Sequence, residues 1–399
     1  MKITKQQACN FLVRYHHLSD DTALSGKDGI LKFFSRIGSV QYDPLNVVGR
    51  NADLVLQSRV ANYCEEMLHG LLYTDRLLID GWDKMMGIYH LNDWAYFYRV
   101  RKAMVQSVIS TLRNRGSLDA LDYLGDVLAH IAQNGASVPK DIKLGQAKAG
   151  TWGHKSVSGV ALDYLWHEGK VGVANKNNAN KTYDLIENLL PTEILDAPDP
   201  FATDDDFVKW YVLRRIGSIG LLWNKSGSGW LGEFLNNKAV RGRALDEHIK
   251  EGTIQEVEIE GIAAKFYVKT EYMSLFEQNN PTTMRFIAPL DNLIWDREMI
   301  ASIFGFKYQW EVYTPVAKRK YGYYVLPVLH NNRFIARFEP EKDKTHLLIK
   351  NWWWEEGVVP TDEIINAVML EIERFAACFG KELQANIIHN IIAASVNPC

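Results

Sequence analysis

Residues 156–191 read "SVSGVALDYLWHEGKVGVANKNNANKTYDLIENLLP" and decide the fold prediction. The apolar spacing of "VSGVALDYLW" predicts a helix that ends at Gly169, because glycine is favoured just past the last helical turn. "KVGVA" and "TYDL" then predict two strands joined by the polar loop "NKNNANK". A helix, a glycine turn and a hairpin in this order indicate a winged-helix module.

The same plan returns at residues 203–272. "DDDFVKWYVLRRIGS" predicts a helix with acids in its first turn, where the helix dipole favours them. "GEFLNNKAVRGRALDEHIKEG" adds one or two helices ending at Gly252, and "IQEVEIEGIAAKFYV" predicts a hairpin turning near Gly261. Residues 3–115 are mainly helical in period, and "LPTEILDAPDPFATDDD" is the expected linker between the two modules.

The last part of the chain changes character. "IWDREMIASIFGF" and residues 361–380 predict helices, whereas "YQWEVYTP", "YGYYVLPVLH", "RFIARFEP" and "HLLIKNWWWEE" predict strands. We therefore predict an α+β chain of tandem winged-helix (helix-turn-helix) domains followed by a strand-rich domain. The predicted boundaries are 1–116 for an N-terminal helical or winged-helix domain, 117–195 and 196–278 for two further winged-helix domains, and 279–399 for a β-rich domain with a terminal helix.

Composition narrows the class of protein. The chain has 399 residues, a formal net charge of −3 and four widely spaced cysteines without a C-x-x-C pair. That spacing predicts neither a disulfide framework nor a cysteine zinc site. No apolar run approaches the roughly 20 residues that cross a bilayer, so we expect a cytoplasmic protein without a membrane partner. The common nucleotide, zinc-protease and serine-hydrolase motifs are absent from the sequence, and no metal is predicted.

A basic stretch lies at residues 301–337. It contains one acid, Glu311, and six cations: Lys307, Lys318, Arg319, Lys320, Arg333 and Arg337. Interleaved tyrosines allow it to bind phosphates and to touch bases, and a solvated strand face explains it about as well. Winged helices commonly dock on duplex DNA, so we take Lys318, Arg319 and Lys320 as the best candidates for contacts to the DNA backbone.

The segment "VQYDP" at residues 40–44 is extended in pattern and ends at a proline. Side chains alternate along a strand, so Val40 and Tyr42 should point into the core and Gln41 and Asp43 to the other side. One interpretation is structural, with Asp43 capping the next turn. The other is chemical, because a carboxylate can stabilise a cationic sugar or activate water while an amide orients that water.

Three stretches of the chain resemble the bacterial winged-helix DNA glycosylases of the AlkZ/YcaQ type. They are "RIGSVQYDPLNVVGRNADLVLQSR", "ALDYLWHEGKVGVANKNNANKTYDLIENLLP" and "FIAPLDNLIWDREMIASIFGFKYQWEVYTPVAKRKYGYYVLPVL". The resemblance implies that Gln41 and Asp43 form the family's catalytic Q-x-D motif, in the form of the YcaQ-like branch. It also implies a basic DNA-binding channel and no cofactor. Where relatives often carry a Glu-x-Trp-x-His-like stretch, this chain reads "IDGWDKMMGIYHL", with Asp80 and Trp82 but without that histidine.

The resemblance implies a monofunctional DNA glycosylase that releases N3- or N7-alkylated purines and unhooks interstrand crosslinks, acting as a monomer on double-stranded DNA. Asn46 and Arg50 follow the motif, and we expect them to contact phosphate or to support the motif, with a structural role equally open. The alternative is a noncatalytic winged-helix DNA-binding protein or transcriptional regulator, in which Gln41 and Asp43 only shape a turn.

Overall fold

The computed structural model describes residues 1–399 except 20–22, 145–155, 178–179, 279–281, 384–390 and 392–399. The chain divides into two compact units. Unit 1 comprises Met1–Leu68 with Asp204–Cys399, and unit 2 is His69–Thr203. The candidate catalytic segment and the basic stretch both belong to unit 1.

Unit 1 contains a four-stranded sheet in the order β1-β8-β9-β7, in which β1 runs parallel to β8 and β8–β9 is an antiparallel hairpin. Its strands are β1 (Lys2–Ile3), β7 (Leu222–Trp223), β8 (Ile254–Ile259) and β9 (Lys265–Lys269). The N-terminal residues therefore add an edge strand to a sheet whose other strands come from much later in the sequence, as the pairing of Ile3 with Ile259 shows.

Unit 1 also contains a set of helices, two of which pack on this sheet. They are α1 (Lys5–Tyr15), α2 (Gly26–Ile37), α3 (Asn51–Gln57), α9 (Asp204–Ile219), α10 (Lys238–Lys250) and α11 (Arg297–Phe304). α1 begins with a capping box. The Thr4 hydroxyl accepts a hydrogen bond from the Gln7 backbone N–H, and the Gln7 side chain accepts one from the Thr4 backbone N–H. α2 packs on α9, and the short strand β2 (Ser39–Gln41) directly follows α2.

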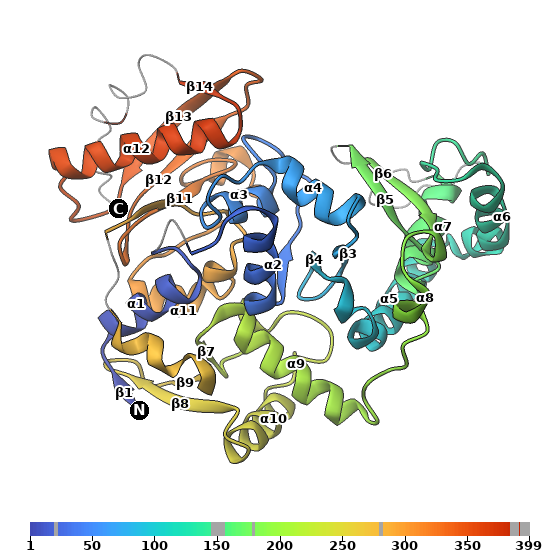
Figure 1. Ribbon diagram of the computed structural model, residues 1–399, viewed down its shortest axis with the longest axis horizontal. Helices are drawn as coiled ribbons and strands as arrows, with labels where there is room; N and C mark the ends of the chain where they lie inside the picture. The colour runs from blue at the N-terminus through green and yellow to red at the C-terminus, as the bar shows by residue number, and fades with distance from the viewer. Residues whose placement is uncertain (20–22, 145–155, 178–179, 279–281, 384–390, 392–399) are drawn as a thin grey trace. The chain divides into compact units, whose positions relative to one another are not determined.

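The second sheet of unit 1 has five strands in the order β10-β11-β12-β13-β14. They are β10 (Met284–Phe286), β11 (Leu326–His330), β12 (Arg333–Glu341), β13 (His346–Trp354) and β14 (Glu382–Leu383). Helix α12 (Asp362–Cys378) lies across this sheet (Figure 1). The ring of its Phe375 contacts the rings of Phe286 and Phe338. This packing confirms the strand-rich character that we predicted for the end of the chain.

Unit 2 combines helices with two antiparallel hairpins. Its elements are β3 (Leu78–Trp82), β4 (Met86–His90), α5 (Tyr98–Arg115), α6 (Leu124–Asn134), α7 (Val157–Glu168), β5 (Val171–Asn177), β6 (Asn180–Leu185) and α8 (Thr192–Leu195), while α4 (Glu65–Tyr73) spans the boundary of the two units. Ile131, Leu162, Leu165 and Val171 belong to one buried cluster that joins α6, α7 and the β5–β6 hairpin.

Both helix, glycine and hairpin units predicted from the sequence are present. α7 ends at Gly169, whose φ of 78° is the left-handed geometry that glycine adopts at low cost, and β5–β6 follows. α10 is followed by Gly252 and by the β8–β9 hairpin around Gly261. The winged-helix assignment of these units, and the boundaries at 116, 195 and 278, stay predictions. Packing joins residues 1–68 and 204–278 in one unit.

One predicted strand is wrong. "YQWEVYTP", residues 308–315, contains no strand, and Tyr313 within it is 84% exposed. No strand in the described part of the chain pairs with this segment, and the carboxylate of Glu311 instead accepts backbone N–H groups from residues 320–322. Among the described residues, no helix is long and apolar enough to cross a membrane.

Candidate active site

Strand β2 ends at Gln41, the first residue of the Q-x-D motif, and is positioned by the end of α2; Asp43 lies two residues beyond the strand. Gly38 ends α2 with a φ of 78°, which turns the chain directly into the strand. The Arg214 guanidinium on α9 donates to the Gly38 carbonyl oxygen at 2.9 Å, so α9 also holds this turn. Val40 and Tyr42 are buried, whereas Gln41 and Asp43 are half-buried. The predicted alternation of side chains is therefore confirmed.

The side chain of Gln41 presents an unused acceptor. Its Oε1 atom is buried and has no hydrogen-bond partner among the described residues. The backbone of the same residue is fixed, because Asn51 Nδ2 donates to the Gln41 carbonyl oxygen at 2.8 Å. A buried carbonyl without a partner costs free energy unless a ligand or a water satisfies it. This oxygen can therefore accept a hydrogen bond from a water molecule.

Asp43 has a partly desolvated carboxyl group. Burial raises its pKa above the ordinary value, and the hydrogen bond that Oδ1 accepts from the Leu45 backbone N–H at 2.9 Å only partly opposes this. That hydrogen bond is the turn cap expected from the structural interpretation, although α3 begins only at Asn51. The buried Tyr324 hydroxyl lies within electrostatic reach: burial and then the Asp43 charge raise the Tyr324 pKa.

Arg50 is tied into a network at the start of α3. Its Nε contacts Asp53 Oδ2 at 2.9 Å, and an Nη lies 3.7 Å from the Glu65 carboxylate. The Tyr63 hydroxyl donates to the other oxygen of Asp53 at 2.6 Å. These bonds favour a supporting role for Arg50. Asn46 is half-buried in the turn between β2 and α3, and its predicted contact with DNA stays a prediction, as does that of Arg50.

The basic residues 318–320 lie on an anchored loop. The Glu311 carboxylate accepts the backbone N–H groups of Lys320, Tyr321 and Gly322 at 2.8, 2.9 and 3.2 Å. Lys318 and Lys320 are exposed and Arg319 is half-buried, with its Nε donating to the Thr314 carbonyl oxygen at 2.8 Å. The backbone under this loop is thus fixed while the two lysines reach solvent.

Comparison with known proteins decides the family. Residues 34–378 match the family model described as DNA glycosylase AlkZ-like, which covers most of the chain. The chain belongs to the AlkZ-like DNA glycosylase family. A solved structure, the DNA glycosylase AlkZ of Streptomyces sahachiroi, has a similar fold with a TM-score of 0.66 and 15% sequence identity. That likeness covers 96% of this chain and 100% of the other. The protein is a DNA glycosylase, and its substrate is DNA.

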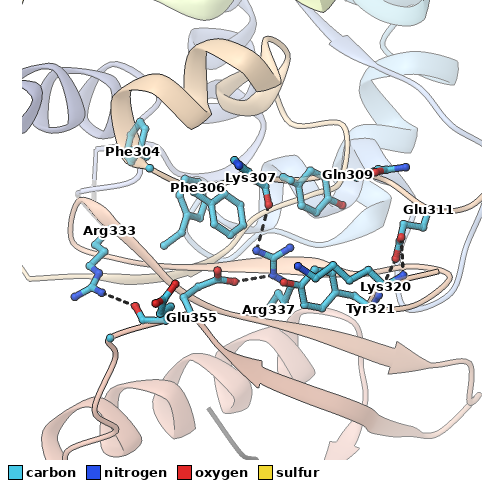
Figure 2. A pocket seen from close by; sticks show the side chains of 15 residues that line it. Phe304, Phe306, Lys307, Gln309, Glu311, Lys320, Tyr321, Arg333, Arg337 and Glu355 are labelled. Atoms are coloured by element: carbon cyan, nitrogen blue, oxygen red, sulfur yellow. Dashed lines mark hydrogen bonds and ion pairs between the residues drawn. The ribbon is translucent and has the colours of Figure 1, made fainter. Parts of the chain in front are cut away.

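A large cavity of the glycosylase lies beside the basic loop. It has a volume of about 910 Å³ and is lined in part by Lys307, Lys320, Arg333, Arg337, Glu311, Glu355 and Glu356. Figure 2 shows Arg337 bridging to Glu355, with an Nε to Oε1 distance of 2.6 Å. The Arg337 guanidinium is 3% exposed and contacts the Tyr321 ring at 4.0 Å and the Phe306 ring at 4.7 Å.

Acids from outside residues 301–337 offset part of the positive charge of this stretch. Glu355 and Glu356, which come later in the sequence, line the same cavity as the basic residues. The buried Arg337 forms an ion pair with Glu355. Neither Gln41 nor Asp43 lines this cavity. Lys318 and Lys320, with Arg319 between them, stay candidates for DNA contacts, and Lys307 and Arg333 are exposed as well.

The sequence did not predict the residues whose side chains bind the backbone of β2. Asn51 and Asn292 bind its backbone, and the fully buried ion pair of Arg59 with Asp291, 2.7 Å between Nη2 and Oδ1, lies beside Asn292 in the chain. The sequence signal was the segment "APLDNLIWD", which carries part of the family resemblance but names no partner. Asp296 caps α11 by accepting the Met299 backbone N–H.

Asp80, in the stretch that departs from the family pattern, has structural partners in unit 2. It forms a buried ion pair with Lys176 and accepts a hydrogen bond from the Tyr73 hydroxyl at 2.9 Å. Within the described part of the chain, no group of three or more histidine, cysteine or acidic side chains could hold a metal ion.

Proposed function

We propose that this glycosylase hydrolyses the N-glycosidic bond of purines alkylated at N3 or N7, and that it unhooks interstrand crosslinks built on such adducts. The observation that supports this most is the buried and unpartnered Gln41 Oε1 at the end of β2, with the partly desolvated Asp43 carboxylate two residues further along the chain. Both residues are half-buried, whereas Val40 and Tyr42, which alternate with them, are buried.

The chemistry follows from the charge of the substrate. An N3- or N7-alkylpurine is a cation and leaves as a neutral base, so the reaction needs no strong general acid. As the bond between C1′ and the base nitrogen breaks, positive charge develops on the sugar, and the Asp43 carboxylate stabilises it. The oxygen of a water then bonds to C1′, and Asp43 takes its proton.

Gln41 orients the water in this mechanism. Its Oε1 accepts one O–H of the water and so directs a lone pair toward C1′ without adding charge to the site. No lysine is present in "VQYDPLNVV", which supports a water-using, monofunctional enzyme over a Schiff-base lyase. The proposal needs no cofactor, and we expect a monomer to act on double-stranded DNA. Because the family is enzymatic, the regulator alternative is set aside.

The substrate class is tested with three duplexes: one carrying 7-methylguanine, one carrying a nitrogen-mustard crosslink, and one unmodified. We expect release of 7-methylguanine and conversion of the crosslinked duplex to a singly adducted strand, with no release of unmodified guanine. Background release from both damaged duplexes, by protein that still binds them, would refute the substrate proposal.

Replacing Lys318, Arg319 and Lys320 together by alanine should weaken binding to all duplexes alike. Each side chain that binds a phosphate releases a counterion, so the slope of log K against log salt should fall by about 1 for each phosphate-binding side chain removed. Fluorescence anisotropy at several salt concentrations measures this. Lys342→Ala with Lys344→Ala, two exposed lysines on the β12–β13 connection, is the control and should keep the slope. An unchanged slope in the triple variant would remove this loop from the interface.

A further inference from the structure

One edge of the catalytic strand is bound by side chains. The carbonyl groups of Ser39 and Gln41, two residues apart, point to the same edge of β2. Asn292 Nδ2 donates to the Ser39 oxygen at 2.9 Å, and Asn51 Nδ2 donates to the Gln41 oxygen at 2.8 Å. Two asparagine amides thus occupy the positions that backbone N–H groups of a neighbouring strand would take.

Each asparagine also binds a second element, so β2 is connected to the rest of unit 1. Asn51 Oδ1 accepts the Leu290 N–H at 3.0 Å, and Asn292 Nδ2 donates as well to the Ser218 carbonyl oxygen in α9 at 3.1 Å. The two side chains are 1% and 0% exposed. Their rotamers are therefore fixed by packing, and they can hold a backbone precisely.

Asn292 acts as a hydrogen-bond donor. Its Nδ2 uses both hydrogens, whereas its Oδ1 is buried and has no partner among the described residues. A buried carbonyl oxygen without a partner lowers stability. The two hydrogen bonds that Nδ2 donates, one to β2 and one to α9, offset this cost. Asn51 uses both ends of its amide.

We infer that Asn51 and Asn292 are positioning residues for glycosidic bond cleavage, which set the rotation of β2 and so the direction in which Gln41 and Asp43 present their side chains. The inference rests on the catalytic roles proposed for those two residues. Of the two, Asn51 should have the larger effect on catalysis, because its Nδ2 donates to the backbone carbonyl of Gln41. Gln41 is the residue proposed to orient the water.

Asn51→Asp tests positioning when it is assayed at a temperature at which the variant is folded. Aspartate keeps the acceptor for the Leu290 N–H and is favourable in the first turn of α3, but it loses the donor and places an oxygen against the Gln41 carbonyl. We expect kcat for 7-methylguanine release to fall about 10- to 100-fold, since displacement of a reacting group by about 1 Å has effects of this size. KM should stay close to wild type, whereas the thermal unfolding midpoint should fall, because the new carboxylate is buried and faces a carbonyl oxygen.

The matched control is Asn224→Asp. Asn224 also donates to one backbone carbonyl, that of Lys238, and accepts one hydrogen bond, from Arg241 Nε, but it has no bond to β2. It should keep the wild-type kcat. If Asn51→Asp does not fold, Asn51→Ala, which removes both bonds without adding charge, is measured instead and should show the same loss in kcat.

The outcomes separate the inference from the proposed function. Loss of kcat in Asn51→Asp that is folded at the assay temperature, with KM kept and with Asp43→Asn inactive, supports both. Wild-type kcat in Asn51→Asp beside an inactive Asp43→Asn overturns the positioning role and leaves the proposed function intact. Wild-type release by Asp43→Asn overturns the proposed function, and this inference with it.

Discussion

Asp43→Asn should lower the single-turnover rate of 7-methylguanine release by about 100-fold or more, which is the contribution typical of a positioned base. Asparagine cannot take the proton of the attacking water and carries no charge against the cationic sugar. Its Oδ1 can still accept the Leu45 N–H, so the turn after β2 should persist. Because burial disfavours the Asp43 charge, the variant should be at least as stable as wild type.

Asp343→Asn is the control for this substitution. Asp343 also shapes a turn through Oδ1, which accepts the backbone N–H groups of Thr345 and His346 at 2.8 and 2.7 Å, but it belongs to the connection between β12 and β13. We expect wild-type release from this variant. If Asp43→Asn released base as fast as wild type while remaining folded, Asp43 would be only a turn cap.

The second large effect concerns stability. Asp291→Asn should lower the free energy of unfolding of unit 1 by about 3–5 kcal/mol, because it leaves the buried Arg59 guanidinium without its counter-charge. Both side chains of this pair are fully buried, and Arg59 also donates to the carbonyl oxygens of His16 and Val55. Asparagine can still cap the turn through the Leu293 N–H, so the loss of stability reports the charge. Urea denaturation followed by tryptophan fluorescence measures it.

An exposed ion pair provides the comparison. Lys225 Nζ lies 3.3 Å from the Glu298 carboxylate, and the two side chains are 49% and 65% exposed. Glu298→Gln should therefore change the free energy of unfolding by less than about 1 kcal/mol. Equally small changes in the free energy of unfolding for Asp291→Asn and Glu298→Gln would contradict the view that the buried Arg59–Asp291 pair stabilises unit 1.

Local patterns in the sequence predicted the features that depend on local geometry. The proline after Asp43 and the alternation before it placed Gln41 and Asp43 on one side of β2, because strand periodicity is a backbone property. Gly169 and Gly252 marked the ends of α7 and α10 for the same reason. "YQWEVYTP" shows the limit: alternation predicts a strand only where a partner strand exists, and here Glu311 binds the backbone of residues 320–322 instead.

The features that the sequence did not predict depend on contacts between distant residues. Arg59 and Asp291 are 232 positions apart, and Asn51 and Leu290 are 239 apart, so no spacing rule brings them together. The surroundings of the basic stretch could not be predicted for a related reason. Its net charge was counted along the chain, and the carboxylate that neutralises Arg337 belongs to Glu355, beyond the window.

The most direct test of the central claim is the pH dependence of single-turnover 7-methylguanine release, corrected for spontaneous depurination. Ionised Asp43 is the active form, and burial raises its pKa above the ordinary value of 3.8. The wild-type rate should therefore be lost as the pH falls through a value above 3.8, and the residual rate of Asp43→Asn should lack this acidic limb. A wild-type rate that stays constant down to pH 3.8, or the same limb in Asp43→Asn, would contradict the assignment of Asp43 as the catalytic carboxylate.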